Sequence, residues 1–142
     1  MTKEEAQKTY LMLQEIEEGA KILQQQMLIL NQQSMEIAST LQSIEELENA
    51  KSGSKSYSMV GQGIYVGSQI TDTKTLLVNA GAGVIVRKTL QETKEMLAQQ
   101  FNETQSLQQK AEDELRRIAQ EGNRLKTELQ GLISYAKDKA KV

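Results

Sequence analysis

A hydrophobic repeat with an average period of 3.5 residues runs through the first third of the sequence. Stepping alternately by three and four residues meets twelve positions, and ten of them are apolar. The positions are Ala6, Thr9, Leu13, Ile16, Ala20, Leu23, Met27, Leu30, Ser34, Ile37, Leu41 and Ile44. Such a repeat makes an α-helix wind around a partner helix, because the apolar stripe must keep facing that partner. We therefore predict one coiled-coil helix over about 3–50, ending near Ser52-Gly53.

A second repeat of the same kind occupies the end of the sequence. Of its fourteen positions, ten are apolar. They are Leu90, Lys94, Leu97, Phe101, Thr104, Gln108, Ala111, Leu115, Ile118, Gly122, Leu125, Leu129, Leu132 and Ala136. Thr89 precedes Glu92 by the spacing of a capping box, which satisfies free amides at a helix start. We predict a helix over 90–140 that folds back on the first as a long antiparallel two-helix coiled coil.

The composition suits a thin helical protein better than a globular domain. Aromatic residues make up only 4% of the chain, although a globular core normally uses large aromatic side chains to bury area. Cysteine and histidine are absent, which excludes disulfides, thiolate metal sites and the commonest general base. Neither a phosphate-binding loop nor a catalytic constellation can be recognised. We expect no catalytic, cofactor-binding or metal-binding residues, and so no enzyme.

Charge is unevenly distributed along the chain, although the net charge is only −2. Residues 1–50 hold three lysines and nine acids (−6), residues 51–88 five basic residues and one acid (+4), and residues 89–142 nine of each. No basic stripe dominates, so nucleic acid is not an expected partner. No stretch approaches the roughly 18 apolar residues that cross a bilayer, and no leader opens the chain. We therefore predict a soluble, cytoplasmic protein without a membrane partner.

The middle of the chain, 57–88, changes to a period of two residues. Alternation from Ile64 to Ile70 predicts one strand, and the apolar runs 75–78 and 84–86 predict two more. Residues 57–60 could form a further short strand. The connections 71–74 and 80–83 are predicted as short hairpin turns.

So few strands cannot be stable alone, and their edges would be open. This head therefore predicts oligomerisation through partner strands. Six residues are predicted to carry assembly: Ile64, Val66, Leu77, Val78, Val84 and Val86. The alternative is that they pack only within their own subunit.

The order helix, two glycine-punctuated hairpins, helix resembles the alpha-class subunit of archaeal-type prefoldin over the whole chain, 1–142. The most specific stretches are Gly63-Ile64-Tyr65-Val66 through Ile70, then Asp72-Thr73, then Val78-Asn79-Ala80-Gly81-Ala82-Gly83-Val84. The family often has Pro-Leu-Gly before the first strand, where this chain has Met59-Val60-Gly61.

The resemblance implies a mainly α protein whose two β-hairpins assemble into an inter-subunit barrel platform. It implies a hetero-hexamer of two alpha-class and four beta-class subunits. This family is an ATP-independent chaperone, a holdase that captures non-native proteins at the coiled-coil tips and delivers them to a group II chaperonin. Such an activity needs no cofactor.

Apolar side chains outside the two repeats occur near the free helix ends. They are Tyr10, Leu11 and Met12 on the first helix and Ile133 and Tyr135 on the second. We predict that they contact clients, because methionine and tyrosine suit adaptable, non-specific contact. The alternative is a widened seam or scattered surface residues, which are common.

Two alternatives stay open at the level of the sequence. The chain could be a structural coiled-coil protein that self-assembles into rings or filaments through its β-hairpins instead of a holdase. Gly19 and Gly122 could soften the helices near their free ends, or Gly122 could let the two helices approach closely.

Overall fold

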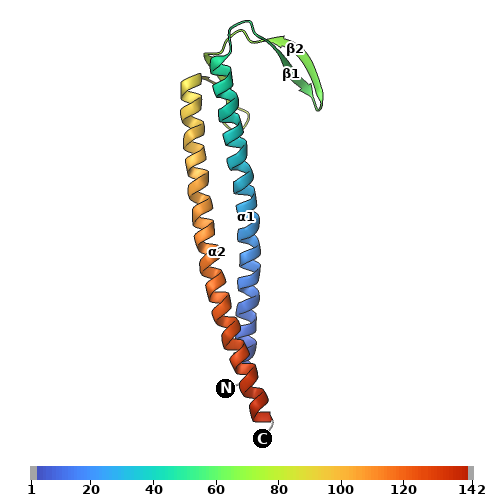
Figure 1. Cartoon of the computed structure of the whole chain (residues 1–142), viewed down its shortest axis with the longest axis vertical. Helices are drawn as coiled ribbons and strands as arrows, with labels where there is room; N and C mark the ends of the chain where they lie inside the picture. Colours follow the sequence, from blue (N-terminus) through green and yellow to red (C-terminus); the bar gives the residue numbers. More distant parts are fainter. Residues whose placement is uncertain (1–2, 141–142) are drawn as a thin grey trace. The chain divides into compact units, whose positions relative to one another are not determined.

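The computed structural model describes residues 3–140 and contains two long helices, α1 and α2 (Figure 1), with four strands between them in the sequence. The elements are α1 Lys3–Asn49, β1 Lys55–Gly61, β2 Ile64–Gln69, β3 Thr75–Asn79, β4 Ile85–Thr89 and α2 Leu90–Ala140. The chain divides into two compact units. Unit 1 comprises Met1–Gln32 and Gln105–Val142, and unit 2 comprises Gln33–Thr104. The predicted fold class is confirmed: mainly helical, with two antiparallel β-hairpins between the helices.

The burial of α1 follows the predicted repeat. Between Ala6 and Ile44, all twelve repeat positions are buried or half-buried, and every other position except Gly19 is exposed. On α2, thirteen of the fourteen predicted positions are buried or half-buried, and Ala136 is exposed. In unit 1 the antiparallel register places Ile16 beside Gly122, so Lys3, the first described residue, stands level with about Tyr135. Ala136 therefore lies past the described part of α1, which explains its exposure.

The core of unit 2 joins the helices to one hairpin. Ile44 on α1 and Leu90 and Leu97 on α2 form a buried cluster. Four half-buried side chains pack against it: Ile37, Leu41, Leu76 and Met96. Leu76 belongs to β3, so the β3–β4 hairpin is held on the helices by a side chain of its own.

The start of α2 is fixed by backbone and side-chain hydrogen bonds. The Thr89 hydroxyl accepts a hydrogen bond from the Glu92 amide (3.1 Å), as the predicted cap requires. The Leu90 amide donates to the carbonyl of Lys74 (2.9 Å). Because β4 ends at Thr89 and α2 begins at Leu90, strand and helix follow each other without a loop.

The strand pairing differs from the sequence prediction in one respect. The 71–74 segment was expected to turn a hairpin, but it links two separate sheets, β1–β2 and β3–β4. Asp72 does form a turn, since its Oδ1 accepts hydrogen bonds from the amides of Lys74 (2.8 Å) and Thr75 (3.3 Å). A local turn signal cannot say which strands pair across it. Gly63, with φ of +77°, provides the tighter turn that pairs β2 with β1.

Element ends also shift by a few residues from the predicted ones. The first strand begins at Lys55 instead of 57, and α1 ends at Asn49. Val84, predicted in a strand, lies in the β3–β4 loop, where its amide donates to the carbonyl of Gly81 (3.0 Å). This loop has positive φ at three successive residues, Gly81, Ala82 and Gly83. Positive φ favours glycine, which occupies two of the three positions.

The two helical glycines of the sequence prediction have different surroundings. A methyl group added at Gly122 would lie 3.4 Å from Cγ2 of Ile16, whereas one added at Gly19 would meet no atom within 4 Å. Gly122 therefore accompanies a close approach of the helices, and Gly19 does not.

This difference predicts unequal effects of two alanine substitutions. Gly19→Ala should raise the free energy of unfolding by about 1 kcal/mol, because alanine is the better helix residue and the space is open. Gly122→Ala should gain less, because the new methyl group presses on Ile16. Urea unfolding followed by circular dichroism measures both. Equal gains would show that close approach is not the reason for Gly122, and amide exchange would then test whether it softens the helix.

Candidate functional site

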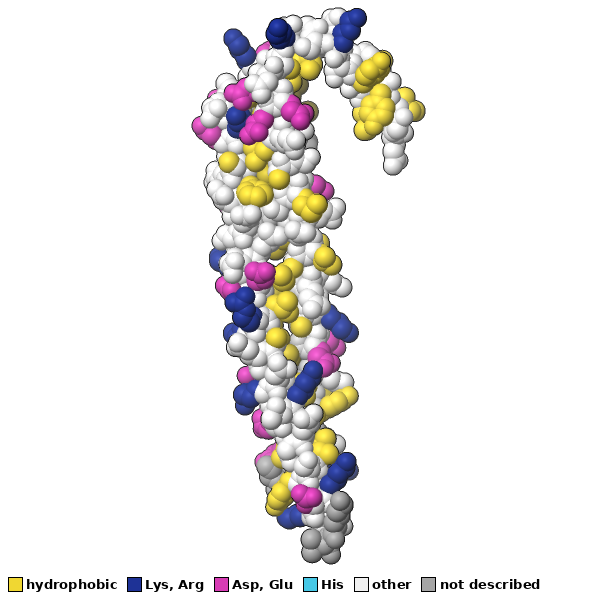
Figure 2. All heavy atoms as spheres, in the orientation of Figure 1, with side chains coloured by type: hydrophobic (Ala, Val, Ile, Leu, Met, Phe, Trp, Pro, Cys, Tyr) yellow, Lys and Arg dark blue, Asp and Glu magenta, His cyan; other side chains and the backbone are white. Residues whose placement is uncertain are grey.

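Two exposed apolar surfaces are candidates for function, and the first is the head surface on the two hairpins. Figure 2 shows apolar side chains gathered on the β1–β2 hairpin. Of the predicted assembly residues, four are exposed: Ile64, Val66, Leu77 and Val84. Val78 and Val86 are half-buried.

The β3–β4 hairpin separates its side chains cleanly by face. Val78 and Val86 stand opposite each other and share the half-buried face with Leu76, which packs on the helical cluster. Leu77 and Ile85 lie on the exposed face, at 70% and 63% exposure. The geometry thus divides the predicted residues of this hairpin into an inner pair and an outward-facing Leu77.

The β1–β2 hairpin exposes apolar side chains on both faces. Tyr57, Met59 and Tyr65 share one face, since Met59 pairs with Tyr65 and Tyr57 with Gly67. On the other face Ser58 stands opposite Val66, and the Ser58 and Ser68 hydroxyls lie 2.8 Å apart. The three residues Tyr57, Met59 and Tyr65 were not predicted for assembly. The sequence pattern could have indicated them, because side chains alternate between the two faces of a strand and these three apolar residues share the second face.

The second candidate is the arm-end surface, where α1 begins and α2 ends in unit 1. All five predicted client-contact residues are exposed there, from 39% for Met12 to 59% for Leu11. Only two of the five share a groove. Met12 and Tyr135 line a common groove of about 870 Å³ on one side of the helix pair, whereas Tyr10, Leu11 and Ile133 are not part of its lining.

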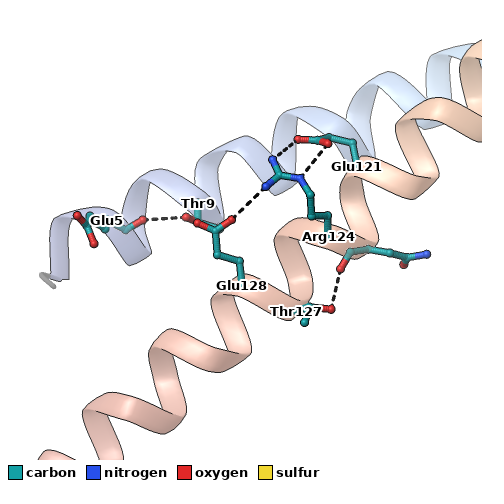
Figure 3. A network of polar contacts seen from close by, with 7 residues as sticks. Glu5, Thr9, Glu121, Arg124, Thr127 and Glu128 are labelled. Atoms are coloured by element: carbon teal, nitrogen blue, oxygen red, sulfur yellow. Dashed lines mark hydrogen bonds and ion pairs between the residues drawn. The ribbon is translucent and has the colours of Figure 1, made fainter.

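Leu125 and Leu132 supply the apolar floor of this groove, and charged side chains stand at its rims. Figure 3 shows the polar network along it. Arg124 is held by Glu121 through its Nε (3.1 Å) and also by Glu128 (3.6 Å). The Arg124 hydrogen bond lowers the pKa of the Glu121 carboxyl below its ordinary value. The Lys139 ammonium lies 5.3 Å from the centre of the Tyr135 ring, a cation–π distance.

The site chemistry is that of contact surfaces. Within residues 3–140 no group of three or more acidic, cysteine or histidine side chains could hold a metal ion. In the same part of the chain no helix is long and apolar enough to span a membrane. Exposed leucine, methionine and tyrosine side chains remove apolar area from water only when another molecule covers them.

Comparison with known proteins agrees with the architecture. A family model described as prefoldin subunit matches residues 16–134. The prefoldin subunit alpha of Archaeoglobus fulgidus is 24% identical over 128 residues, which cover 90% of this chain and 93% of that protein. The cryo-EM structure of filamentous PFD from Methanocaldococcus jannaschii has a TM-score of 0.67 at 12% identity, covering 86% of this chain and 95% of that one. At that identity the likeness shows the fold.

The match to the family model includes most of both helices and the whole head. It confirms the resemblance predicted from the glycine-punctuated hairpins, and the archaeal alpha subunit agrees with the predicted class. We conclude that this chain belongs to the prefoldin family, whose members are chaperone subunits that assemble with one another and are not enzymes.

Proposed function

We propose that this chain is the alpha-class subunit of an ATP-independent holdase that captures non-native proteins at the arm-end surface. The observation that carries the proposal is the set of exposed apolar side chains in unit 1 where the two helices end: Tyr10, Leu11, Met12, Ile133 and Tyr135. A non-native protein exposes apolar segments of many shapes. Flexible methionine and amphipathic tyrosine side chains can contact such segments without a fixed geometry.

The head surface supports assembly with partner subunits. A two-stranded hairpin is marginal alone in water, and β1–β2 has apolar side chains exposed on both faces. Strands from neighbouring subunits would cover these faces and pair with the open edges. We propose four beta-class partners for two copies of this chain, in a barrel-like platform built from the hairpins.

Delivery of clients to a group II chaperonin and a cytoplasmic location complete the proposal. Both are supported by membership in the family. We also propose that 1–142 works as one prefoldin-like unit, with the head for assembly and the helix ends for clients.

A second candidate function is a structural subunit that self-assembles into filaments. One observation favours it: the structurally similar PFD of Methanocaldococcus jannaschii is filamentous. Size separates the two functions. A holdase subunit forms a closed complex with its partner, whereas a filament former grows with concentration when alone.

The assembly predicts a sharp outcome in light scattering after size-exclusion chromatography. This chain mixed with a beta-class subunit from the same source should give one species with the mass of two alpha and four beta chains. Leu77→Asp should abolish this species, because Leu77 is 70% exposed on the outward face and a buried unpaired charge is costly. Leu107→Asp, on α2 outside the head, is the matched control. Polymers of the chain alone would favour the structural function instead.

Client capture predicts suppression of aggregation without nucleotide. The assembled complex, at stoichiometric amounts, should suppress light scattering by a chemically denatured protein diluted into buffer. A Tyr10→Ser, Leu11→Ser double variant should suppress it less, because two of the exposed apolar side chains are lost. Leu107→Ser removes an exposed leucine of α2 that lies away from the helix ends, and it should have no effect. An assembled complex without any suppression would exclude the holdase function.

A further inference from the structure

The groove beside Met12 and Tyr135 has a feature that its apolar lining does not explain. Its wall on α2 includes Gly131, where a side chain is missing. A methyl group added at Gly131 would meet no atom within 4 Å, so the packing of this chain does not require glycine there. Glycine is among the poorest residues for a helix interior. The glycine therefore has two effects: it destabilises the helix, and it leaves the groove open. Only the open groove could be useful to the protein.

The sequence of α2 shows what Gly131 replaces. The pattern Glu-x-x-Arg occurs at 114–117 and again, seven residues later, at 121–124. In both places the arginine binds its glutamate, with Nε to carboxylate distances of 3.0 Å and 3.1 Å. The third repeat begins with Glu128, but glycine stands at 131 in place of arginine. The arginines at 117 and 124 thus have no counterpart at 131, and Arg124 is the last arginine on this side of α2 that lines the groove.

Resting on the proposed function, we infer that this groove binds an amphipathic helical segment of a non-native polypeptide. Both walls are α-helices, whose backbone amides and carbonyls are already paired within each helix. An extended segment would find no backbone partners there, whereas a helical segment brings its own hydrogen bonds. A third helix would also continue the existing seam of unit 1, since Leu132 is a half-buried seam residue that lines the groove.

The size and spacing of the groove fit a short helix. Its α2 wall extends from Arg124 to Tyr135, about 16 Å at about 1.5 Å per residue, which is three helical turns. Met12 lies on the facing α1 wall. Apolar side chains at i, i+3 or i+4 and i+7 of a docked helix would reach Met12, Leu132 and Tyr135, the mode by which grooves bind amphipathic helices.

The charges of the groove indicate that it would select a segment by the apolar face of that segment and not by its charge. Its charged lining residues are Glu5, Lys8, Arg124 and Glu128, two of each sign. Arg124 is moreover bound by Glu121 and Glu128. A neutral lining gives no net attraction to a strongly charged segment. Binding should therefore change little with salt concentration, unlike binding driven by surface charge.

The test uses the full chain and two labelled peptides of the same composition, each about 14 residues long, enough for the three turns of the groove. One places leucines at helical spacing among glutamine, lysine and glutamate, and the other alternates leucine with the polar residues. Fluorescence anisotropy should show at least about tenfold tighter binding of the helical-pattern peptide. Gly131→Arg should weaken that binding by about tenfold or more, because the new side chain continues the arginine spacing of 117 and 124 into the groove lining.

Gly19→Arg is the matched control. It replaces another glycine of unit 1 by arginine, also with open space at its Cβ, and Gly19 is not part of the groove lining. It should leave the affinity unchanged. Because both substitutions replace glycine inside a helix, neither is expected to unfold the protein. Circular dichroism of each variant verifies this.

Three results would overturn the inference. They are equal binding of both peptides, unchanged binding by Gly131→Arg, and a dimer of the chain that Gly131→Arg abolishes, which would make a second copy the occupant. In each case, suppression of aggregation by the wild-type complex would leave the holdase function standing. Loss of that suppression with helical-peptide binding intact would exclude the holdase function and keep the groove as a helix-binding site.

Discussion

The structure depends on a stripe of apolar side chains one residue wide on each of two helices. Every repeat position of α1 from Ala6 to Ile44 is buried or half-buried, and the positions between, apart from Gly19, are exposed. A seam of this kind stabilises two helices against each other but encloses little volume. Among the described residues no large side chain is fully buried, and Leu125, at 2% exposure, comes closest. Such a core cannot also cover four strands, and so the apolar area of the head remains for other molecules.

The two hairpins differ in how much of their apolar surface packs on the helices. The β3–β4 hairpin packs on the helices, because Leu76 contacts the cluster of Ile44, Leu90 and Leu97. Val78 and Val86 lie on the same face of the hairpin as Leu76 and are half-buried. The β1–β2 hairpin has no such side chain in the cluster, and Tyr57, Met59 and Tyr65 stay exposed. The β1–β2 hairpin thus lacks a contact with the helical cluster, although Leu77 and Ile85 of the β3–β4 hairpin are also exposed. The helices are also joined by a surface salt bridge between Lys94 on α2 and Glu48 on α1 (2.8 Å). Its hydrogen bond raises the pKa of Lys94.

The sequence predicted the inner ends of both helices, near 50 and 90, to within about one residue, because a heptad seam is a local, repeated signal. It failed where the outcome depended on distant partners. The Asp72 turn was correctly placed but was assigned to the wrong strand pair, since the β1–β2 pairing depends on Gly63. Val78 and Val86 read like Leu77 in the sequence, and only the position of Leu76 on the helical cluster separates them. The groove could not be foreseen from Gly131 alone, although the interrupted Glu-x-x-Arg pattern was visible in the sequence.

The two helices are connected to their hairpins in different ways, because α2 follows β4 without a loop and α1 does not join β1 directly. Thr89 ends the strand, Leu90 begins the helix, and the Thr89 hydroxyl accepts a hydrogen bond from the Glu92 amide across the junction. On the other side, residues 50–54 separate α1 from β1, with Gly53 in a left-handed conformation. No residue separates β4 from α2, so a displacement of β4 acts directly on the first turn of α2, whereas residues 50–54 lie between β1 and α1 and are hydrogen-bonded to Ile70. Within unit 2, α2 is therefore joined more directly to its neighbouring hairpin than α1 is.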